Sequence, residues 1–192
     1  MQIQWISAAL LFVTSAAALA QTPIQRGTAT ASFKGKQVTI DYGRPALKGR
    51  TVNELTAKLP PDRMWRAGAD RVTTLTTEGD ILVGDKKIPA GKYTLYVYIP
   101  PSGAWSLAIN TDPGIELAKL WPAAPPDVAK AIYPRLDGYQ KNIADKEVAR
   151  VPMKSGAVAT AVELFTITLD PQGMLTMLWG DRSWSVDVKP AP

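Results

Sequence analysis

The feature that most constrains the fold of this chain is a set of short segments in which apolar and polar residues alternate with a period of two. The segments with this pattern are residues 36–42, 92–99, 104–110, 161–170, 174–180 and 183–189, and the last three look like consecutive strands. Because successive side chains of a β-strand point to opposite faces, the alternation indicates strands with one buried face. In residues 92–99 it places Leu95 and Val97 on one face and Tyr96 on the other.

Turn-forming residues separate these segments at the spacing of an all-β domain. Glycine, proline and aspartate cluster at residues 84–85, 100–103 and 112–114, between candidate strands. Residues 71–78 and 147–154 add further candidates, for a total of about nine strands, a number typical of antiparallel sandwiches and barrels. We therefore predict an all-β, single-domain antiparallel β-sandwich, with a jelly-roll-like or barrel-like arrangement as the alternative.

One short helix is expected among the strands. Thr51 is followed three residues later by Glu54, which is the spacing of a capping box. This pattern predicts a helix over residues 52–59, and Pro60 and Pro61 then end it.

The longest departure from the strand pattern is a proline-rich excursion over residues 113–139. It contains five prolines, and one or two helical turns are expected around residues 127–133. A connection of this length is uncommon inside a compact β domain. We expect it to be either a flap over a site or a loosely held excursion.

The first twenty residues have the features of a secretory signal peptide. They form an apolar run that ends in Ala18-Leu19-Ala20, a pattern that signal peptidase favours, so the mature chain is expected to begin at Gln21. No Lys or Arg precedes the apolar run, which leaves an uncleaved membrane anchor as the alternative. We predict a periplasmic or secreted protein, with residues 21–192 as one domain and no transmembrane segment after signal cleavage.

The chain has no cysteine and no histidine. Without cysteine, an exported protein has no disulfide to stabilise it, so packing must hold the fold, and thiol nucleophiles are excluded. Without histidine there is no imidazole base, no His-supported serine nucleophile and no His-containing zinc site. An enzyme built on this chain would depend on carboxylates, lysine, tyrosine or arginine.

The order of several motifs resembles a family of exported bacterial proteins. The motifs are DYGRPALKGR (41–50), MWRAGAD (64–70), KKIPAGKYTLYVYIP (86–100), AWSLAIN (104–110), the positions Tyr139, Asp145 and Arg150, and then VELFTITLD and LTMLWGD. This family is catalogued as a domain of unknown function, number 2911. The resemblance implies an exported, β-rich, single-domain protein and brings no established activity. The family's Trp-Arg pair is usually followed by Thr-Gly-Ala-Asn, whereas this chain has an aspartate, Asp70, at the last of those positions.

The motif at residues 41–50 is the first candidate site. Its two glycines and its proline shape a stiff turn, from which Arg44, Lys48 and Arg50 can project. Arginine offers paired donors to a carboxylate, phosphate or sulfate group. The structural alternative is that Arg44 pairs with a carboxylate of its own chain, such as Asp41 or Asp70, and holds the loop in place.

The motif at residues 64–70 is the second candidate site. In an extended segment Trp65 and Arg66 point to opposite faces, so one can be buried while the other is free. Arg66 and Asp70 could join the cations of the first motif in a polar cluster at one end of the sandwich, where loops gather. The predicted helix is the only element between the two motifs, and we expect it to bring them together. A tryptophan in a β protein is more often part of the core, which is the alternative for Trp65.

Other kinds of site stay open on the sequence alone. Exposed aromatic side chains stack on sugar faces, and Tyr96, Tyr98 and Trp121 are candidates for such a platform. Carboxylates are available for a hydrolase, although no spacing singles out a pair. Calcium could bind the aspartates at positions 80, 85 and 112, but aspartate is also expected at turns for backbone reasons alone.

These observations favour binding over catalysis. We predict a non-catalytic ligand- or glycan-binding module of the cell envelope, which takes a small anionic or sugar ligand through Arg44, Lys48, Arg50, Arg66, Asp70 and Trp65. A carboxylate-dependent hydrolase acting on glycans and a structural partner protein of the envelope are the alternatives. The net charge of +5 is dispersed among carboxylates, so no nucleic-acid partner is expected. We expect neither a cofactor nor a metal.

Overall fold

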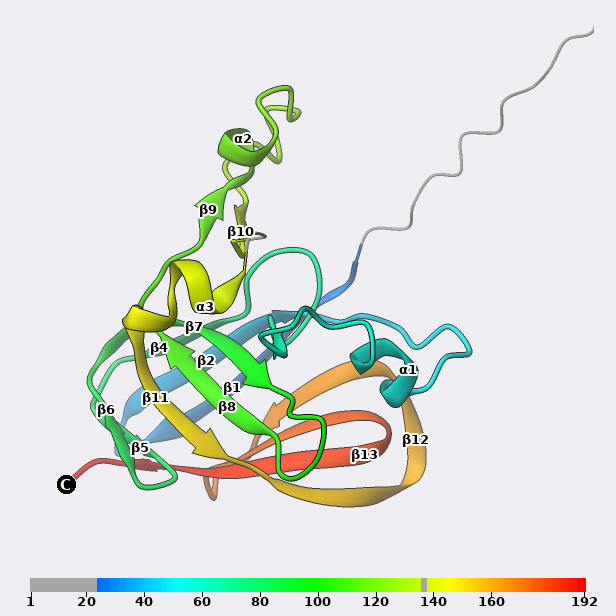
Figure 1. Ribbon diagram of the computed structural model, residues 1–192. Coiled ribbons are helices and arrows are strands. Elements are labelled where there is room, and N and C mark those ends of the chain that lie inside the picture. The colour runs from blue at the N-terminus through cyan, green and yellow to red at the C-terminus, as the bar shows by residue number, and fades with distance from the viewer. Residues whose placement is uncertain (1–23, 136–137) are drawn as a thin grey trace, which may run out of the picture.

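The computed structural model describes residues 24–135 and 138–192 and consists mainly of strands (Figure 1). The predicted signal segment, residues 1–20, lies outside the described residues. The helices are short, and within the described ranges none is long and apolar enough to cross a membrane.

Most of the strands belong to one large sheet. In spatial order these are β1 (Arg26–Phe33), β2 (Lys36–Gly43), β4 (Thr74–Thr77), β7 (Gly91–Tyr98), β8 (Ser106–Asn110) and β11 (Glu147–Pro152). The short strand β3 (Met64–Trp65) also pairs with β7, with Trp65 opposite Val97. All of these pairings are antiparallel.

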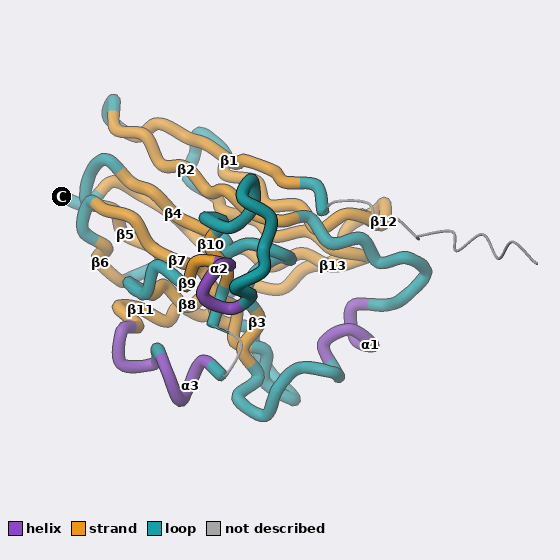
Figure 2. Tube along the Cα trace, turned by 90° about the horizontal axis from the view of Figure 1, so that it is seen from above, coloured by secondary structure: helices purple, strands orange, loops and turns teal. Residues whose placement is uncertain are grey.

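A second sheet lies against the first. Its order is β12 (Lys154–Leu169), β13 (Met174–Pro190), β5 (Ile81–Val83) and β6 (Lys86–Ile88), again antiparallel throughout. Figures 1 and 2 show the two sheets as stacked layers. The predicted all-β antiparallel sandwich is therefore confirmed.

The core fills the space between the two sheets. The alternation in β2 and β7 turns Ile40, Leu95 and Val97 inward, where they join Phe165 of β12 and Met177 of β13 in one cluster. Each of these five side chains is at most 1 % exposed. Burying one such side chain contributes roughly 1.5–3 kcal/mol, so this layer supplies much of the stability of a chain without disulfides.

The C-terminal strands are longer than the sequence pattern predicts. Residues 174–180 and 183–189 were expected to be two strands, but both belong to β13. Gly180, between them, has a φ of 62° and still pairs with Val162 of β12. Glycine adopts this left-handed conformation without a side-chain clash, so the strand bends there without ending.

Strand β1 was missed by the sequence pattern. Its inward positions include Ala29, Ala31 and Phe33, all buried against the core. Alanine is too small to mark a buried face clearly in an alternating pattern, and the strand therefore reads as polar.

The predicted helix exists but is shorter than expected. Helix α1 (Val52–Thr56) begins with the capping box: the Glu54 amide donates to the Thr51 hydroxyl at 3.2 Å, and the Glu54 carboxylate accepts from the Thr51 amide at 2.7 Å. Residues 57–59 continue as turn rather than as helix.

The proline-rich excursion forms a projecting arm, defined here as residues 113–135. It is a two-stranded ribbon of β9 (Ile115–Glu116) and β10 (Ile132–Tyr133), with helix α2 (Leu117–Leu120) between them (Figure 1). The helical turns predicted at residues 127–133 are only partly present. A turn is closed by the Ala129 amide and the Pro125 carbonyl at 2.9 Å, but strand pairing takes over at Ile132.

The outer face of the large sheet is locally covered. Helix α3 (Tyr139–Asn142) and the following 3-10 turn η1 (Ala144–Lys146) follow the arm and pack on β7 and β8. Tyr139 and Ile143 form a second apolar cluster with Met64, Tyr96 and Ala108. Tyr96, which the alternation placed on the face away from the core, is consequently only 5 % exposed.

Candidate ligand-binding site

The two motifs singled out in the sequence pack directly against each other. Gly43, at the end of β2, lies so close to Ala69 that any side chain at position 43 would overlap the Ala69 carbonyl oxygen. Gly68 is similarly restricted, because a Cβ there would lie 2.9 Å from the Gly43 carbonyl oxygen. The glycines thus let the loop of residues 66–70 touch β2, and backbone contact joins the motifs.

Arg44 of the first motif binds the opposite sheet. Its guanidinium donates to the Phe165 carbonyl at 3.3 Å and to the Thr166 hydroxyl at 2.9 Å, both on β12. Asp41, one of its proposed partners, instead forms an ion pair with Arg26. Arg44 therefore connects the two layers of the sandwich without a carboxylate partner among the described residues.

Lys48 and Arg50 lie at the exposed surface of the same loop. The Arg50 guanidinium donates to the Leu47 carbonyl at 2.8 Å, and the Lys48 amide donates to the Glu163 carboxylate at 2.7 Å. These bonds fix the loop locally, and the structure does not gather the two side chains with Arg66 around one pocket.

Trp65 belongs to the core and to a pocket at once. Its ring stacks on Trp179, with centroids 5.3 Å apart and an interplanar angle of 8°, and meets Phe165 edge-on at 4.8 Å. These contacts fix the indole, and its remaining surface lines the pocket described below. Trp65 therefore packs against the core and also lines the pocket.

Asp70 binds the base of the arm. Its carboxylate accepts a hydrogen bond of 2.6 Å from the Tyr133 hydroxyl, and this bond is the main reason that the pKa of Tyr133 is raised. Asp70 has a φ of 65°, a left-handed conformation that aspartate tolerates better than most residues. The aspartate at this position therefore has a structural partner in the arm.

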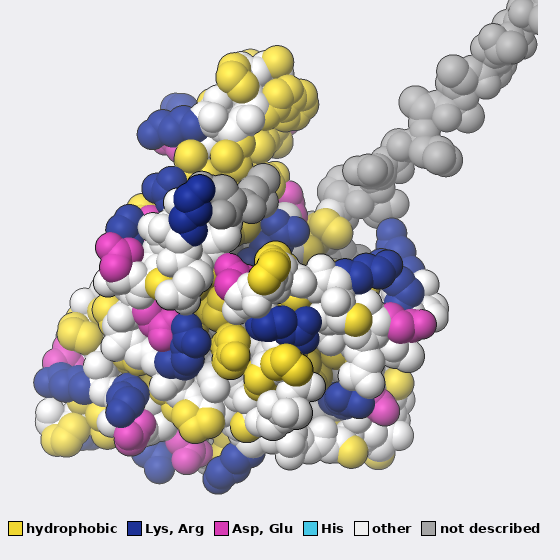
Figure 3. Space-filling model, viewed as in Figure 1, with side chains coloured by type: hydrophobic (Ala, Val, Ile, Leu, Met, Phe, Trp, Pro, Cys, Tyr) yellow, Lys and Arg dark blue, Asp and Glu magenta, His cyan; other side chains and the backbone are white. Residues whose placement is uncertain are grey.

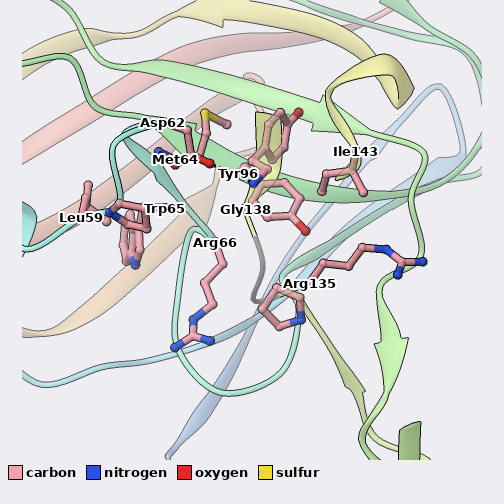
Figure 4. Close-up of a pocket in the computed structure, with 12 residues that line it drawn as sticks. Leu59, Asp62, Met64, Trp65, Arg66, Tyr96, Arg135, Gly138 and Ile143 are labelled. Carbon is pink, nitrogen blue, oxygen red and sulfur yellow. Dashed lines mark hydrogen bonds between the residues drawn. The ribbon is translucent and has the colours of Figure 1, made fainter. Parts of the chain in front are cut away.

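A pocket of about 260 Å³ lies where the arm meets the large sheet, and we call it the arm-base pocket. Its lining residues are Leu59, Pro60, Asp62, Met64, Trp65, Arg66, Tyr96, Pro134, Arg135, Gly138, Tyr139 and Ile143. Figure 4 shows Arg66 and Arg135 on different segments of the chain, with their guanidinium groups directed away from each other. The candidate residues Arg66 and Trp65 are therefore at this pocket.

Tyr96 lines the arm-base pocket, and its hydroxyl oxygen is buried. Its oxygen has no hydrogen-bond partner among the described residues. The Thr94 hydroxyl, on the same face of β7, already donates to the Asp112 carbonyl at 2.8 Å. Two other buried polar atoms in the described part of the chain, on Arg26 and Trp179, also lack partners, but neither residue lines this pocket.

The environment of Tyr96 keeps its hydroxyl protonated. Burial is the main cause that raises the pKa of Tyr96 to about 12, and the nearby Asp112 carboxylate adds to it. The nearby Thr94 hydroxyl opposes this shift, and the guanidinium groups of Arg135 and Arg66 oppose it to a smaller extent. The group at this wall is therefore a neutral hydroxyl that can donate a proton in a hydrogen bond.

Asp112 organises the charges beside the pocket. Its buried side chain accepts bonds from the Lys146 ammonium at 2.8 Å and from the Gly114 amide at 3.0 Å, and Arg135 lies 3.5 Å away. Burial opposes ionisation, but these three donors outweigh it and hold the pKa of Asp112 below its ordinary value. Arg135 thus pairs with the Asp112 carboxylate. Arg66, in contrast, forms no hydrogen bond or ion pair with the described residues.

Asp62 and Tyr139 close the far wall of the pocket. The two Asp62 carboxylate oxygens accept the Met64 amide at 3.2 Å and the Tyr139 amide at 2.9 Å. The Tyr139 hydroxyl donates to Glu147 at 2.7 Å and accepts from Asn110 at 3.0 Å. Burial is the main cause that raises the pKa of Tyr139. This wall is therefore fixed before any ligand arrives.

The loop that carries Arg66 is also fixed. Ala67 is fully buried with a φ of 49°, an uncommon conformation for a residue with a side chain, and its carbonyl accepts the Thr73 hydroxyl at 2.9 Å. Such backbone strain persists only where the surroundings enforce it and is frequent at functional sites.

Several residues of the pocket were not predicted as a site. Tyr96 was proposed only as a sugar platform on an exposed face, and Tyr139 only as part of a family motif. Asp62 and Arg135 carried no signal, because a lone charge in a loop is ordinary. The alternation did mark Tyr96 as facing away from the core, and a covering segment was the missing information.

In the described part of the chain, the turn aspartates Asp80 and Asp85 are paired with lysines rather than grouped around a metal site. Figure 3 shows Lys and Arg side chains dispersed over the visible face, with apolar side chains at the far end of the arm. Asp80 pairs with Lys87, and Asp85 pairs with Lys86. Over residues 24–135 and 138–192, no three carboxylates gather in a way that could hold a metal ion.

The comparison with protein families agrees with the order of motifs. Residues 24–188 match the family described as "Protein of unknown function (DUF2911)", so the chain belongs to this family. The comparisons with curated proteins and with solved structures found no match.

Proposed function

We propose that this protein is a non-catalytic binding module that holds a small molecule in the arm-base pocket. The observation that carries the proposal is that Tyr96 lines the pocket and that its buried hydroxyl has no hydrogen-bond partner among the described residues. Leaving such a group unsatisfied costs about 1–3 kcal/mol, which a ligand that bonds to it would recover. A concave apolar pocket with a few polar groups is the usual form of a small-molecule site.

The groups around the pocket favour binding over catalysis. A general base needs a carboxylate that is free to accept a proton from the substrate. The carboxylate of Asp62 already accepts two amide protons, and that of Asp112 is held by Lys146, so both serve the structure. Among the described residues that line the pocket, no pair of free carboxylates supports the glycan hydrolase considered from the sequence.

The proposed place of action is the periplasm or the exterior. This part rests on the apolar leader and its Ala18-Leu19-Ala20 site. Expression of the whole chain in a bacterial host should yield, in the exported fraction, a protein whose amino terminus by mass spectrometry is Gln21. Recovery of the uncleaved chain in the membrane fraction would favour the anchor instead.

A thermal-shift screen of residues 21–192 tests the binding proposal. Sugars, organic acids, phosphates and calcium are the probes, and a ligand at one hundred times its dissociation constant adds about 2.7 kcal/mol, or several degrees for a domain of this size. The screen is repeated on Leu59→Trp, which places an indole in the pocket, and on Arg182→Ala, which removes an exposed arginine of β13 away from it.

The expected result is at least one probe that stabilises the wild type and Arg182→Ala but not Leu59→Trp. Circular dichroism should show that all three proteins are folded. Probes that stabilise Leu59→Trp as much as the wild type, or the absence of any stabilising probe, would contradict the proposal.

A further inference from the structure

Building on the function proposed above, we infer that the arm-base pocket takes a compact monocarboxylate with an apolar body. In this assignment Arg66 pairs with the carboxylate and the Tyr96 hydroxyl donates a hydrogen bond to it. The body of the ligand lies against Leu59, Pro60 and Met64. Four observations on the described residues support this class over phosphates and sugars.

The first observation is the balance of charge. Among the described residues that line the pocket, Arg66 and Arg135 are cations and Asp62 is a carboxylate, which leaves one positive charge in excess. Arg66 is the cation without a partner among the described residues. A ligand with a single negative charge would complete this balance, whereas the second charge of a phosphate monoester would stay uncompensated in a partly dry site.

The second observation is the small number of free polar groups. Five lining side chains are polar, but Asp62, Arg135 and Tyr139 already have partners in the protein. Of these five, Arg66 and Tyr96 have no hydrogen-bond partner among the described residues. A sugar carries a hydroxyl group on nearly every carbon, and most of these would be buried without partners. Two donors suit the two oxygens of one carboxylate.

The third observation is the apolar character and the size of the pocket. Leu59, Pro60, Met64, Pro134 and Ile143 supply aliphatic surface, and the methionine can adapt to an irregular ligand. The volume of about 260 Å³ lies just below the range of about 300 to 1,000 Å³ typical of drug-sized ligands. The pocket therefore fits a compact apolar group such as a single ring or a branched chain.

The fourth observation is preorganisation. Arg66 extends from a loop held by the buried Ala67 and the Thr73 hydroxyl, and Tyr96 lies in the middle of β7 against the Tyr139 ring at 4.8 Å. Binding therefore does not have to order the backbone that carries either donor, which lowers its entropic cost.

Isothermal titration calorimetry of residues 21–192 tests the ligand class. The carboxylate probes are phenylacetate, cyclohexanecarboxylate and 4-methylpentanoate, and the comparison probes are phenylacetamide, glucose and inorganic phosphate. We expect saturable one-site binding of at least one carboxylate, and binding of the matching neutral amide at least tenfold weaker. Glucose and phosphate should give no binding heat.

Three variants assign the contacts. Tyr96→Phe removes only the hydroxyl and should weaken carboxylate binding about tenfold, as expected for loss of a hydrogen bond to a charged group. Arg66→Ala should abolish the binding, and Arg182→Ala should leave it unchanged. Thermal unfolding of each variant, compared with the wild type, shows whether a loss of binding comes from a loss of the fold.

The outcomes separate this inference from the proposed function. If glucose or phosphate binds better than every carboxylate and the binding depends on Arg66, the ligand class is wrong but the pocket remains a binding site. If no carboxylate binds, the inference also fails, and the thermal-shift screen decides the proposed function separately. If carboxylate binding survives in Arg66→Ala, it takes place elsewhere, and the assignment of the pocket is wrong.

Discussion

The two faces of β7 are both buried, yet they are built differently. On the inner face, Leu95 and Val97 pack against the second sheet in a fully apolar layer. On the outer face, Thr94 and Tyr96 are also buried. Tyr96 lies beneath the segment that follows the arm and lines the arm-base pocket. Burial alone therefore does not identify a core, because a segment packed over polar groups can leave a cavity and unpaired hydrogen-bond donors.

The largest effect on stability is expected on the inner face. Phe165 is fully buried and meets Tyr42, Trp65 and Trp179 edge-on. Phe165→Ala should lower the free energy of unfolding by about 3–5 kcal/mol, as measured by chemical denaturation. The matched control, Val148→Ala at an exposed position of β11, should change it by less than about 0.5 kcal/mol. A small effect at position 165 would show that the two sheets do not form the core described.

A smaller loss is expected from the charged group of the outer face. Asp112→Asn keeps the shape of the side chain but weakens its bonds to Lys146 and Arg135, so we expect a loss of roughly 1.5–3 kcal/mol at neutral pH. Chemical denaturation measures this loss directly. An unchanged free energy of unfolding would show that these bonds are not formed in solution.

The same carboxylate gives a pH dependence with a defined sign. The pKa of Asp112 is lower in the folded protein than its ordinary value of 3.8, so its stabilisation is complete above that value. The stabilisation decreases as the pH falls from 3.8 toward the folded-state pKa. Unfolding measured from pH 6 to pH 2 should therefore show a steeper loss in the wild type than in Asp112→Asn. Parallel curves for the two proteins would show that Asp112 does not contribute to the pH dependence of stability.

The arginines of the two sequence motifs, Arg44 and Arg66, are expected to differ in their effects on stability and on ligand binding. Arg44→Ala removes two hydrogen bonds between the sheets and should cost about 1–2 kcal/mol, with ligand binding retained because Arg44 does not line the pocket. Loss of binding in this variant, with the fold intact, would support the cluster predicted from the sequence, in which Arg44 contacts the ligand.

The smallest effect on stability is expected for Arg66. It has no partner among the described residues to lose, so Arg66→Ala should change the free energy of unfolding by less than about 0.5 kcal/mol. Ligand binding, measured by calorimetry on the same sample, should be lost. A large destabilisation would mean that Arg66 stabilises the fold through contacts with the protein, and that it is not a free cation for the ligand.

The sequence was sufficient to predict the two packed sheets, but it was insufficient to predict the segment that covers the outer face of β7. Alternation identified strands in both sheets, such as β2, β8 and β12, from their apolar faces, and the capping box located α1 from two residues. It failed at β1, where alanines replace large side chains, and at Gly180, where a glycine bends a strand that its pairing keeps intact. These failures arise because tertiary pairing outweighs local signals.

The site was only partly predictable for a related reason. Gly43 stood out as a turn residue of the first motif, but its role, like that of Gly68, is contact between two backbones that are distant in sequence. Arg44 and Arg66 look alike in the sequence, and only the position of β12 shows that one is bound to the protein. Tyr96 became a site residue because α3 covers it, and no local pattern in β7 contains that information.

The most direct test of the outer-face site is backbone amide chemical-shift mapping during a titration with the tightest-binding probe. We predict that the largest shifts fall on Arg66, Tyr96 and Ile143, which line the arm-base pocket, and that they saturate together. Shifts that instead concentrate on Gly103, Gly156 and Trp184, around a separate depression on the protein, would contradict the account.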